Sequence, residues 1–322
     1  SIAFLTLAHN LTSIMSIPFI LTFIFIKLFA EKKKVLLLTA YCLLFTFGIG
    51  LSAFFWLPSA LESSKTGVDQ MVFEKFDPPS KHVAFPLQLW SGVWGYGGSS
   101  AGIDDGLSFQ LGKIHLTGSL IAIILFVIAR SLRRGNLMLH FSITGLLFSL
   151  FMILSPSRFI WDSVQAFSYI QFPWRFLAFA SLFSSVLAAR AIDALVTRNP
   201  QHAIRYLLLT IFCLLFIVYS LPFFQPKFKF PITVDQLISR QKLVWDYSKI
   251  SDEYLPKGFV PPISAEVAMR VDNKQNQLLV NKLKEETPIR QSANLISLFS
   301  FVTFITFIII ISAKKYGQNI SG

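Results

Sequence analysis

The sequence predicts an all-α polytopic membrane protein with about seven transmembrane helices, long extracytoplasmic loops and a small mixed extracytoplasmic segment. Its composition is the first reason, since 53% of the 322 residues are hydrophobic, 34 are Phe and only 14% are charged. The second reason is the length of the apolar runs, because a helix needs about 20 mostly apolar residues to cross the hydrocarbon core. The third is that basic gaps alternate with tryptophan-containing gaps between these runs.

Apolar runs of suitable length recur along the whole chain. They are 10–29, 35–57, 114–129, 137–154, 176–196, 205–224 and 295–313. For 137–154, a buried helix is the alternative interpretation. None of the runs carries a charged residue near its centre, whereas ion-coupled transporters usually need ionisable residues inside the membrane. This pattern weakens a transporter interpretation.

The basic residues of every second gap predict the orientation in the membrane. They are Lys27, Lys32, Lys33 and Lys34; Arg130, Arg133 and Arg134; Arg190, Arg198 and Arg205; and Lys314 and Lys315. Short loops rich in Lys and Arg remain in the cytoplasm. We therefore expect an N-terminus outside the cell and a cytoplasmic C-terminus. Because an outside N-terminus without a leader is unusual, we also expect the chain to be a fragment.

The net charge of +12 does not indicate nucleic-acid binding. The basic residues flank apolar runs instead of forming one patch with interleaved aromatic residues. The expected partners are therefore membrane lipids, with no nucleic acid. Cys42 and Cys213 lie inside apolar runs and indicate neither redox chemistry nor a metal.

The second run ends in Phe54, Phe55 and Trp56, and we expect Pro58 to stop its helix. The outer loop 58–113 that follows is too long for a simple connection. Alternating apolar residues at 83–89 predict a short extended segment.

Glycine is dense in this loop between Ser91 and Gly106. Glycines allow the backbone to approach a ligand closely, although a surface loop without a ligand has the same composition. Asp104 and Asp105 make a divalent cation conceivable here. His9, His82 and His115 fall on the same side of the membrane without a metal-ligand spacing, so we assign no metal ligand and no cofactor.

The second outer loop, 155–175, places Ile160, Val164 and Phe167 on one helical face. This spacing predicts a short amphipathic helix in the interface. The loop ends at Trp174 and Arg175, immediately before the fifth run. A guanidinium at this edge suits a phosphate, because its planar fork forms two parallel hydrogen bonds. A salt bridge to a loop carboxylate, or contact with lipid phosphate, is the alternative.

Tryptophan occurs six times, always in the gaps that we assign to the outer side. Trp56 and Trp161 are expected to be interfacial anchors, as is usual for this residue. Trp94 in the glycine-rich loop and Trp174 beside Arg175 are better placed to bind a ligand.

These features predict three parts of the chain. Residues 1–224 form the transmembrane bundle with the outer loops 58–113 and 155–175. Residues 225–294 form the extracytoplasmic segment, with helix over 233–249 and strands over 265–271 and 277–280. Residues 295–322 supply the final transmembrane helix and a cytoplasmic tail.

Several segments, in their order along the chain, resemble a known family. They are Ala8-His9-Asn10-Leu11-Thr12, Gly50 to Pro58 with Glu62, Trp94-Gly95-Tyr96-Gly97, Ser108-Phe109-Gln110-Leu111-Gly112, Phe172-Pro173-Trp174-Arg175-Phe176 and Glu253-Tyr254-Leu255-Pro256. They look like the C-terminal half of bacterial multi-pass proteins labelled 6-pyruvoyl-tetrahydropterin synthase-related, which are similar to GT-C membrane glycosyltransferases. The resemblance extends to about residue 260. The pterin part of the label implies nothing, since the chain has no matching zinc-binding His cluster.

The resemblance implies a bacterial plasma-membrane enzyme that transfers a sugar from a polyprenyl-phosphate donor on the outer face. In that group the catalytic carboxylate usually lies in the first outer loop, upstream of this sequence, so the catalytic residues are unknown. His9 and Asn10 would hydrogen-bond the donor, and Arg175 would neutralise the leaving phosphate. Four acidic residues would position the acceptor or a cation: Glu62, Asp104, Asp105 and Glu253. Trp94, Trp174 and Tyr254 complete the expected substrate-binding set.

Two alternatives to this enzyme remain. A non-catalytic membrane protein that binds or moves lipid-linked glycans would have the same outer face. A transporter would need ionisable residues or broken helices in the membrane outside this sequence.

Overall fold

The computed structural model describes residues 2–70, 72–73, 77–92, 95, 97–128, 137–197, 202–226, 229, 231–240, 242–246, 254–260, 263–266 and 288–320. Over these ranges the chain is helical and has no strand. Its only β-type pairings there are single bridges, Thr66 with Pro256 and Ala84 with Leu154. The expected all-α class is confirmed.

Five helices are long and apolar enough to cross a membrane, and two shorter apolar helices accompany them. The five are Asn10–Ala30, Lys34–Leu51, Pro173–Ala194, Tyr206–Phe224 and Pro288–Ile311, and the two are Lys113–Ile128 and Leu137–Ile153. Each of the seven apolar runs of the sequence thus overlaps one of these helices. The chain is an integral membrane protein.

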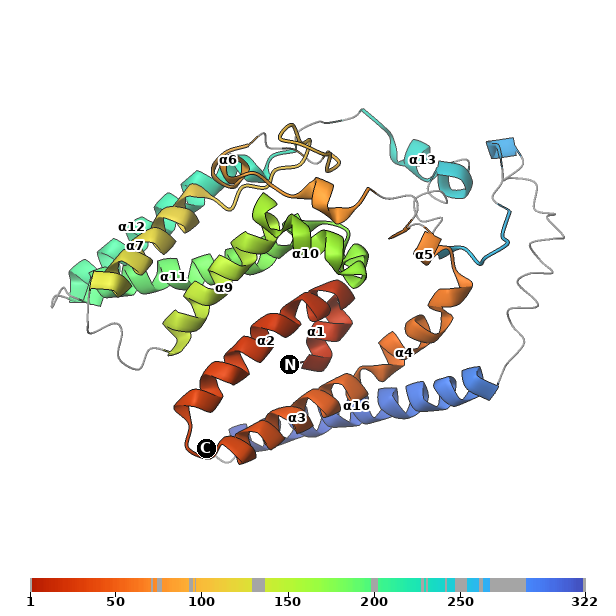
Figure 1. Ribbon diagram of the computed structural model, residues 1–322, viewed down its shortest axis with the longest axis horizontal. Coiled ribbons are helices and arrows are strands. Elements are labelled where there is room, and N and C mark those ends of the chain that lie inside the picture. The colour runs from red at the N-terminus through yellow and green to blue at the C-terminus, as the bar shows by residue number, and fades with distance from the viewer. Residues whose placement is uncertain are drawn as a thin grey trace. The chain divides into compact units, whose positions relative to one another are not determined.

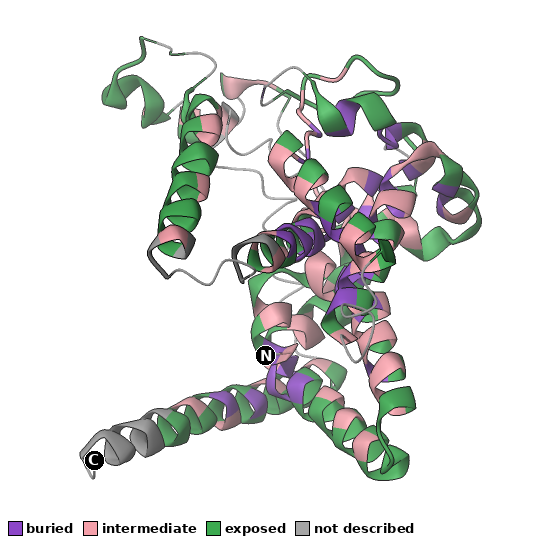
Figure 2. Cartoon of the chain, turned by 90° about the vertical axis from the view of Figure 1, so that its left-hand side faces the viewer, coloured by how far each residue is buried: buried purple, intermediate pink, exposed green. Residues whose placement is uncertain are grey.

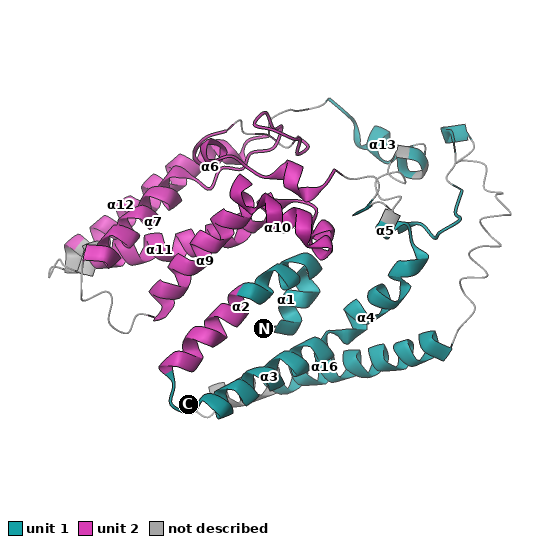
Figure 3. Cartoon of the chain, in the orientation of Figure 1, with its two compact units in different colours: residues 1–18, 31–75, 231–322 teal, residues 19–30, 76–230 magenta. Residues whose placement is uncertain are grey.

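The chain divides into two compact units, which are drawn in different colours in Figure 3. Unit 1 contains residues 1–18, 31–75 and 231–322, and unit 2 contains residues 19–30 and 76–230. Helix α2 (Asn10–Ala30) contributes its first half to unit 1 and its second half to unit 2.

Unit 1 is built mainly from helices that pack as pairs. Helix α1 (Ile2–Ala8) packs on α3 (Lys34–Leu51), and α4 (Ala53–Glu62) packs on α16 (Pro288–Ile320). Shorter elements are η1 (Ser63–Lys65), α5 (Val68–Gln70), α13 (Val234–Leu237) and η8 (Lys242–Asp246). Most of residues 288–311 of α16 are exposed, as Figure 2 shows. A lipid-facing helix has this pattern because the bilayer solvates apolar side chains.

The break between α3 and α4 lies at Ser52, and the expectation that Pro58 stops the helix is wrong. The Ser52 hydroxyl donates to the Gly48 carbonyl oxygen at 3.1 Å, a local bond that competes with regular helix. Ser300 of α16 donates to the Gly50 carbonyl at 2.8 Å and accepts from the Phe54 amide at 3.2 Å. Ser300 therefore satisfies backbone groups on both sides of the break. Pro58 lies inside α4, where it removes a single backbone donor.

In unit 2, helix α11 (Leu177–Thr197) packs against both α7 (Lys113–Ile128) and α9 (Leu137–Ile153), as can be followed in Figure 1. Helix α12 (His202–Ser220) continues into the 3-10 turn η7 (Leu221–Phe224) and packs on α11. Small residues allow close packing: a Cβ on Gly118 would lie 2.7 Å from the Ala188 Cβ. Aromatic rings fill the space beside α11: Phe19, Phe148, Phe176, Phe179 and Phe183.

The outer loop of unit 2 contains η3 (Pro79–His82) and α6 (Pro86–Trp90). The extended segment expected over 83–89 is only partly right. Ala84 is extended and its amide donates to the Ile153 carbonyl at 2.9 Å, but Pro86 then begins a helix. Proline suits a first helical position, and the Gln88 side chain accepts from the Phe85 amide at 2.8 Å.

The second outer loop contains η4 (Ser155–Ser157), α10 (Arg158–Ser163), η5 (Gln165–Ile170) and η6 (Pro173–Phe176). The single amphipathic helix expected here is wrong, because Val164 is extended and divides it. Trp161 is buried and is not an interfacial anchor. Its indole N–H donates to the Met152 carbonyl at 3.0 Å, which satisfies a carbonyl at the end of α9.

Of the helix expected over 233–249, the described residues show α13 and the π-helical η8, whereas 241 and 247–249 lie outside them. Ala265 and Glu266 lie in a helical turn, while the rest of the two expected strands lies outside the described residues.

Candidate functional site

A strained turn precedes α11. Gln171 has φ 65° and ψ −45°, and the Phe172 amide donates to the Ile170 carbonyl at 2.7 Å. This combination is a γ-turn with positive φ, a rare conformation for a residue with a side chain. Such strain costs roughly 1–3 kcal/mol and persists only where the surroundings fix it. Phe172, extended as a residue before proline usually is, and the buried Pro173 fix it here.

Arg175 lies across this turn. Its guanidinium donates from Nη1 to the Ile170 carbonyl at 2.8 Å and from Nη2 to the Gln171 Oε1 at 3.1 Å. The guanidinium carbon lies 5.4 Å from the centroid of the Phe172 ring, close enough for a cation–π contact. These contacts use two of its five N–H donors, which leaves three.

The partners of Arg175 are neutral oxygens. Within the described part of the chain, no carboxylate forms an ion pair with it. The expected alternative of a salt bridge to a loop carboxylate therefore has no support among these residues. A half-buried guanidinium without a counter-ion attracts an anion strongly, because nearby low-dielectric protein weakens screening.

Aromatic rings wall the site. Trp174 stacks on Phe172 at 5.2 Å and on Phe109 at 5.7 Å between ring centroids. Its indole nitrogen is buried and has no hydrogen-bond partner among the described residues. A buried donor without a partner is unusual in folded proteins. Trp174 is thus part of the packed wall and retains one unused N–H.

His82 joins the site from η3. Its ring meets Phe172 edge to face at 5.1 Å, and its Nδ1 lies 3.2 Å from the Ser99 hydroxyl. His82 is also buried. Through its contacts with Ser99 and Phe172, it links the glycine-rich loop to the surroundings of Arg175.

Asp105 closes the glycine-rich loop. One of its carboxylate oxygens accepts from the Ser100 amide at 2.7 Å, and the other accepts from Gln88 Nε2 at 3.0 Å. Gly97 and Gly106 cross so closely that a Cβ on Gly97 would lie 2.8 Å from the Gly106 Cα. The loop thus has a defined path that depends on glycine, and Asp105 is committed to holding it.

The other members of the expected site have separate surroundings. The Asp104 side chain is exposed. In unit 1, His9 Nδ1 accepts from the Thr12 amide at 3.1 Å and caps the start of α2, beside the exposed Asn10. Glu62 is ion-paired with Arg290 of α16 at 3.2 Å, and Tyr254 is exposed. Trp94 and Glu253 lie outside the described residues.

Of the expected set, Trp174 and Arg175 lie around Phe172 together with His82. Asp105 belongs to the same unit, where it contacts Ser100 and Gln88. Over the described ranges, no three His, Cys, Asp or Glu side chains lie close enough to hold a metal ion. Gln171 and Ser99 were not found by sequence reasoning. A positive φ at a glutamine leaves no signal in the sequence, and a serine contact between distant loops leaves none either.

No family model, curated protein or solved structure matches this chain.

Proposed function

We propose that this chain acts in a GT-C-like membrane glycosyltransferase reaction that takes a sugar from a polyprenyl-phosphate donor. The proposal combines the resemblance of its outer segments to that group with the chemistry around Arg175. The observation that carries it is a guanidinium with three remaining donors and no carboxylate partner within the described residues. A phosphate monoester or diester is the anion that best matches such a planar fork.

Arg175 would act on the leaving group. When the bond between the sugar and the phosphate breaks, negative charge develops on the phosphate oxygen. A guanidinium already fixed by Ile170 and Gln171 stabilises that charge without having to reorient. Stabilisation that grows as charge develops lowers the barrier instead of only tightening substrate binding.

The proposed location is the outer face of a bacterial plasma membrane, with the first residues outside and the C-terminus in the cytoplasm. The distribution of basic residues supports this orientation. A donor attached to a lipid would reach the outer face without a nucleotide, in keeping with the lack of a nucleotide-binding motif in the outer loops.

Replacing Arg175 tests the proposal. In purified protein, Arg175→Ala should weaken binding of a polyprenyl phosphate by at least about tenfold, since a charged hydrogen bond typically contributes about 1.5–3 kcal/mol. In membranes it should abolish sugar transfer from polyprenyl-phosphate hexoses. Arg175→Lys should recover only part of either activity, because an ammonium cannot form the paired contact.

Arg158, an exposed arginine at the start of α10, is the matched control. Arg158→Ala should leave binding, transfer and expression unchanged. Equal transfer by the Arg175→Ala and wild-type proteins at equal expression would refute the role of Arg175.

A second candidate is a non-catalytic protein that binds or moves lipid-linked glycans. The hydrogen bonds that occupy both Asp105 oxygens favour it, because they commit that carboxylate to loop structure. The test uses the full natural protein. If it binds a polyprenyl phosphate in a way that depends on Arg175 but transfers no sugar, this candidate is supported.

A further inference from the structure

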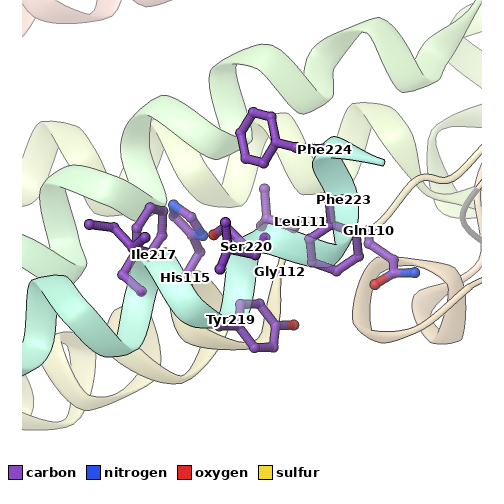
Figure 4. A pocket seen from close by; sticks show the side chains of 11 residues that line it. Gln110, Leu111, Gly112, His115, Ile217, Tyr219, Ser220, Phe223 and Phe224 are labelled. Atoms are coloured by element: carbon purple, nitrogen blue, oxygen red, sulfur yellow. The ribbon is translucent and has the colours of Figure 1, made fainter. Parts of the chain in front are cut away.

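A cavity of about 440 Å³ lies in unit 2 between the start of α7 and the end of α12. Figure 4 shows that its lining comes from the loop that leads into α7, from the C-terminal part of α12 and from η7. Its volume falls within the range of small-molecule sites, about 300–1,000 Å³. Its lining is mostly apolar, with Phe216, Ile217, Phe223 and Phe224 among the side chains.

Helix α12 is loosely covered on this side. None of the residues in its span, Tyr206–Phe224, is buried within the protein. Ile217, which lines the cavity, is 54% exposed, so the cavity is accessible from the helix surface that faces the bilayer. Lipid chains solvate such surfaces, and an apolar cavity beside them would otherwise be empty.

Polar groups lie at one end of the cavity. The Lys113 amide donates to the Tyr219 hydroxyl at 3.4 Å, which links the first residue of α7 to a lining residue of α12. The Lys113 ammonium lies 5.8 Å from the centroid of the Trp90 ring and, over the described ranges, forms no ion pair with a carboxylate. Lysine, tryptophan and tyrosine together are typical of the headgroup level of a membrane. A mostly apolar cavity thus lies next to a lysine, because Lys113 directly follows the lining residue Gly112 and its amide bonds to the lining residue Tyr219.

We propose that this cavity binds one chain of an anionic membrane phospholipid, whose phosphate lies beside Lys113. An apolar cavity with a lysine adjacent to its lining complements a lipid that has an apolar chain and a negative headgroup. The bilayer presents such lipids to the open side of α12 at very high local concentration, which favours occupation by mass action. The site is separate from Arg175, so the proposal holds or fails independently of the proposed glycosyltransferase.

Native mass spectrometry of the delipidated protein in detergent would test this site with three added lipids. They are phosphatidylglycerol, phosphatidylcholine and a polyprenyl phosphate. Phosphatidylglycerol should bind more tightly than phosphatidylcholine. The wild-type protein should also unfold at a higher temperature with phosphatidylglycerol bound than without it. Tighter binding of the polyprenyl phosphate at this cavity would overturn the assignment to a phospholipid.

Two pairs of variants locate the binding. Ile217→Trp fills the cavity from an exposed position and should abolish specific phosphatidylglycerol binding, whereas Ile211→Trp, on the same helix but outside the cavity, should not. Lys113→Gln should weaken binding by about fivefold, the usual contribution of one lysine at an anionic membrane surface. Lys81→Gln is its control, because Lys81 is paired with Asp77 at 2.6 Å. Equal binding by Ile217→Trp and Ile211→Trp would overturn the proposal.

Discussion

At the scale of single residues, the backbone turn at Gln171 sets the position of the Arg175 guanidinium. This γ-turn points the Ile170 carbonyl and the Gln171 side-chain oxygen at Arg175, and both groups hold the guanidinium without neutralising it. Neutral acceptors orient the cation and leave its charge for a ligand. The strain at Gln171 is thus associated with a functional group, where backbone outliers often occur.

The charge state of position 171 tests this interpretation. Gln171→Glu keeps the shape of the side chain but gives Arg175 a carboxylate partner, so polyprenyl-phosphate binding should fall by about tenfold or more as the two anions compete. The free energy of unfolding should not decrease, because the guanidinium would then donate to an ionised carboxylate instead of a neutral amide oxygen. Titration of the lipid into each purified variant measures the first quantity, and chemical denaturation measures the second.

Gln165→Glu, an exposed position in η5, changes the net charge equally and serves as the control. If both variants bind polyprenyl phosphate as the wild type does, Arg175 is not the anion-binding group.

At the scale of helices, unit 2 is held by close approach at small residues. A Cβ on Gly145 of α9 would lie 2.5 Å from the Phe183 ring of α11, and Ser119 of α7 donates to the Ser184 carbonyl at 3.2 Å. Close backbone packing of this kind drives association between membrane helices, since apolar burial contributes little in lipid.

Gly145→Ala should therefore destabilise unit 2 by about 1–3 kcal/mol, the usual cost of overpacking. The expected result is a lower melting temperature in detergent. Combining it with Phe183→Leu should restore part of the loss by making room for the methyl group. Gly50→Ala in α3 is the control, because a Cβ there meets nothing within 4 Å and alanine favours helix. A Gly145→Ala protein as stable as Gly50→Ala would contradict this account of the packing.

The apolar runs predicted where the helices lie, because length and hydrophobicity are properties of the local sequence. The breaks were not predictable in the same way. The break in the second apolar run lies at Ser52, whereas the sequence predicted a helix end at Pro58. Ser300, far away in the sequence, satisfies the backbone groups that this break exposes. Trp161 is buried for a similar reason, as a carbonyl at the end of α9 receives its N–H.

At the scale of the whole molecule, the pattern of basic loops makes a definite topological prediction. In a background with Cys42→Ser and Cys213→Ser, a cysteine at exposed position 104 should react with a membrane-impermeant maleimide in intact cells. A cysteine at position 33 should react only after permeabilisation, because basic gaps remain inside. The reverse labelling would invert the proposed orientation and place Arg175 on the cytoplasmic side.

The all-α membrane class and the positions of the apolar helices can be predicted from the sequence, since both follow from composition and run length. It also identified Arg175 as a candidate, because charge next to an apolar run is visible in one dimension. The three-dimensional structure was needed to find which residues surround Arg175, which carboxylates already have hydrogen-bond partners and where the cavity beside α12 lies. Those properties arise from contacts between segments distant in the chain, such as His82 with Phe172 or Lys113 with Tyr219, and local sequence carries no record of such contacts.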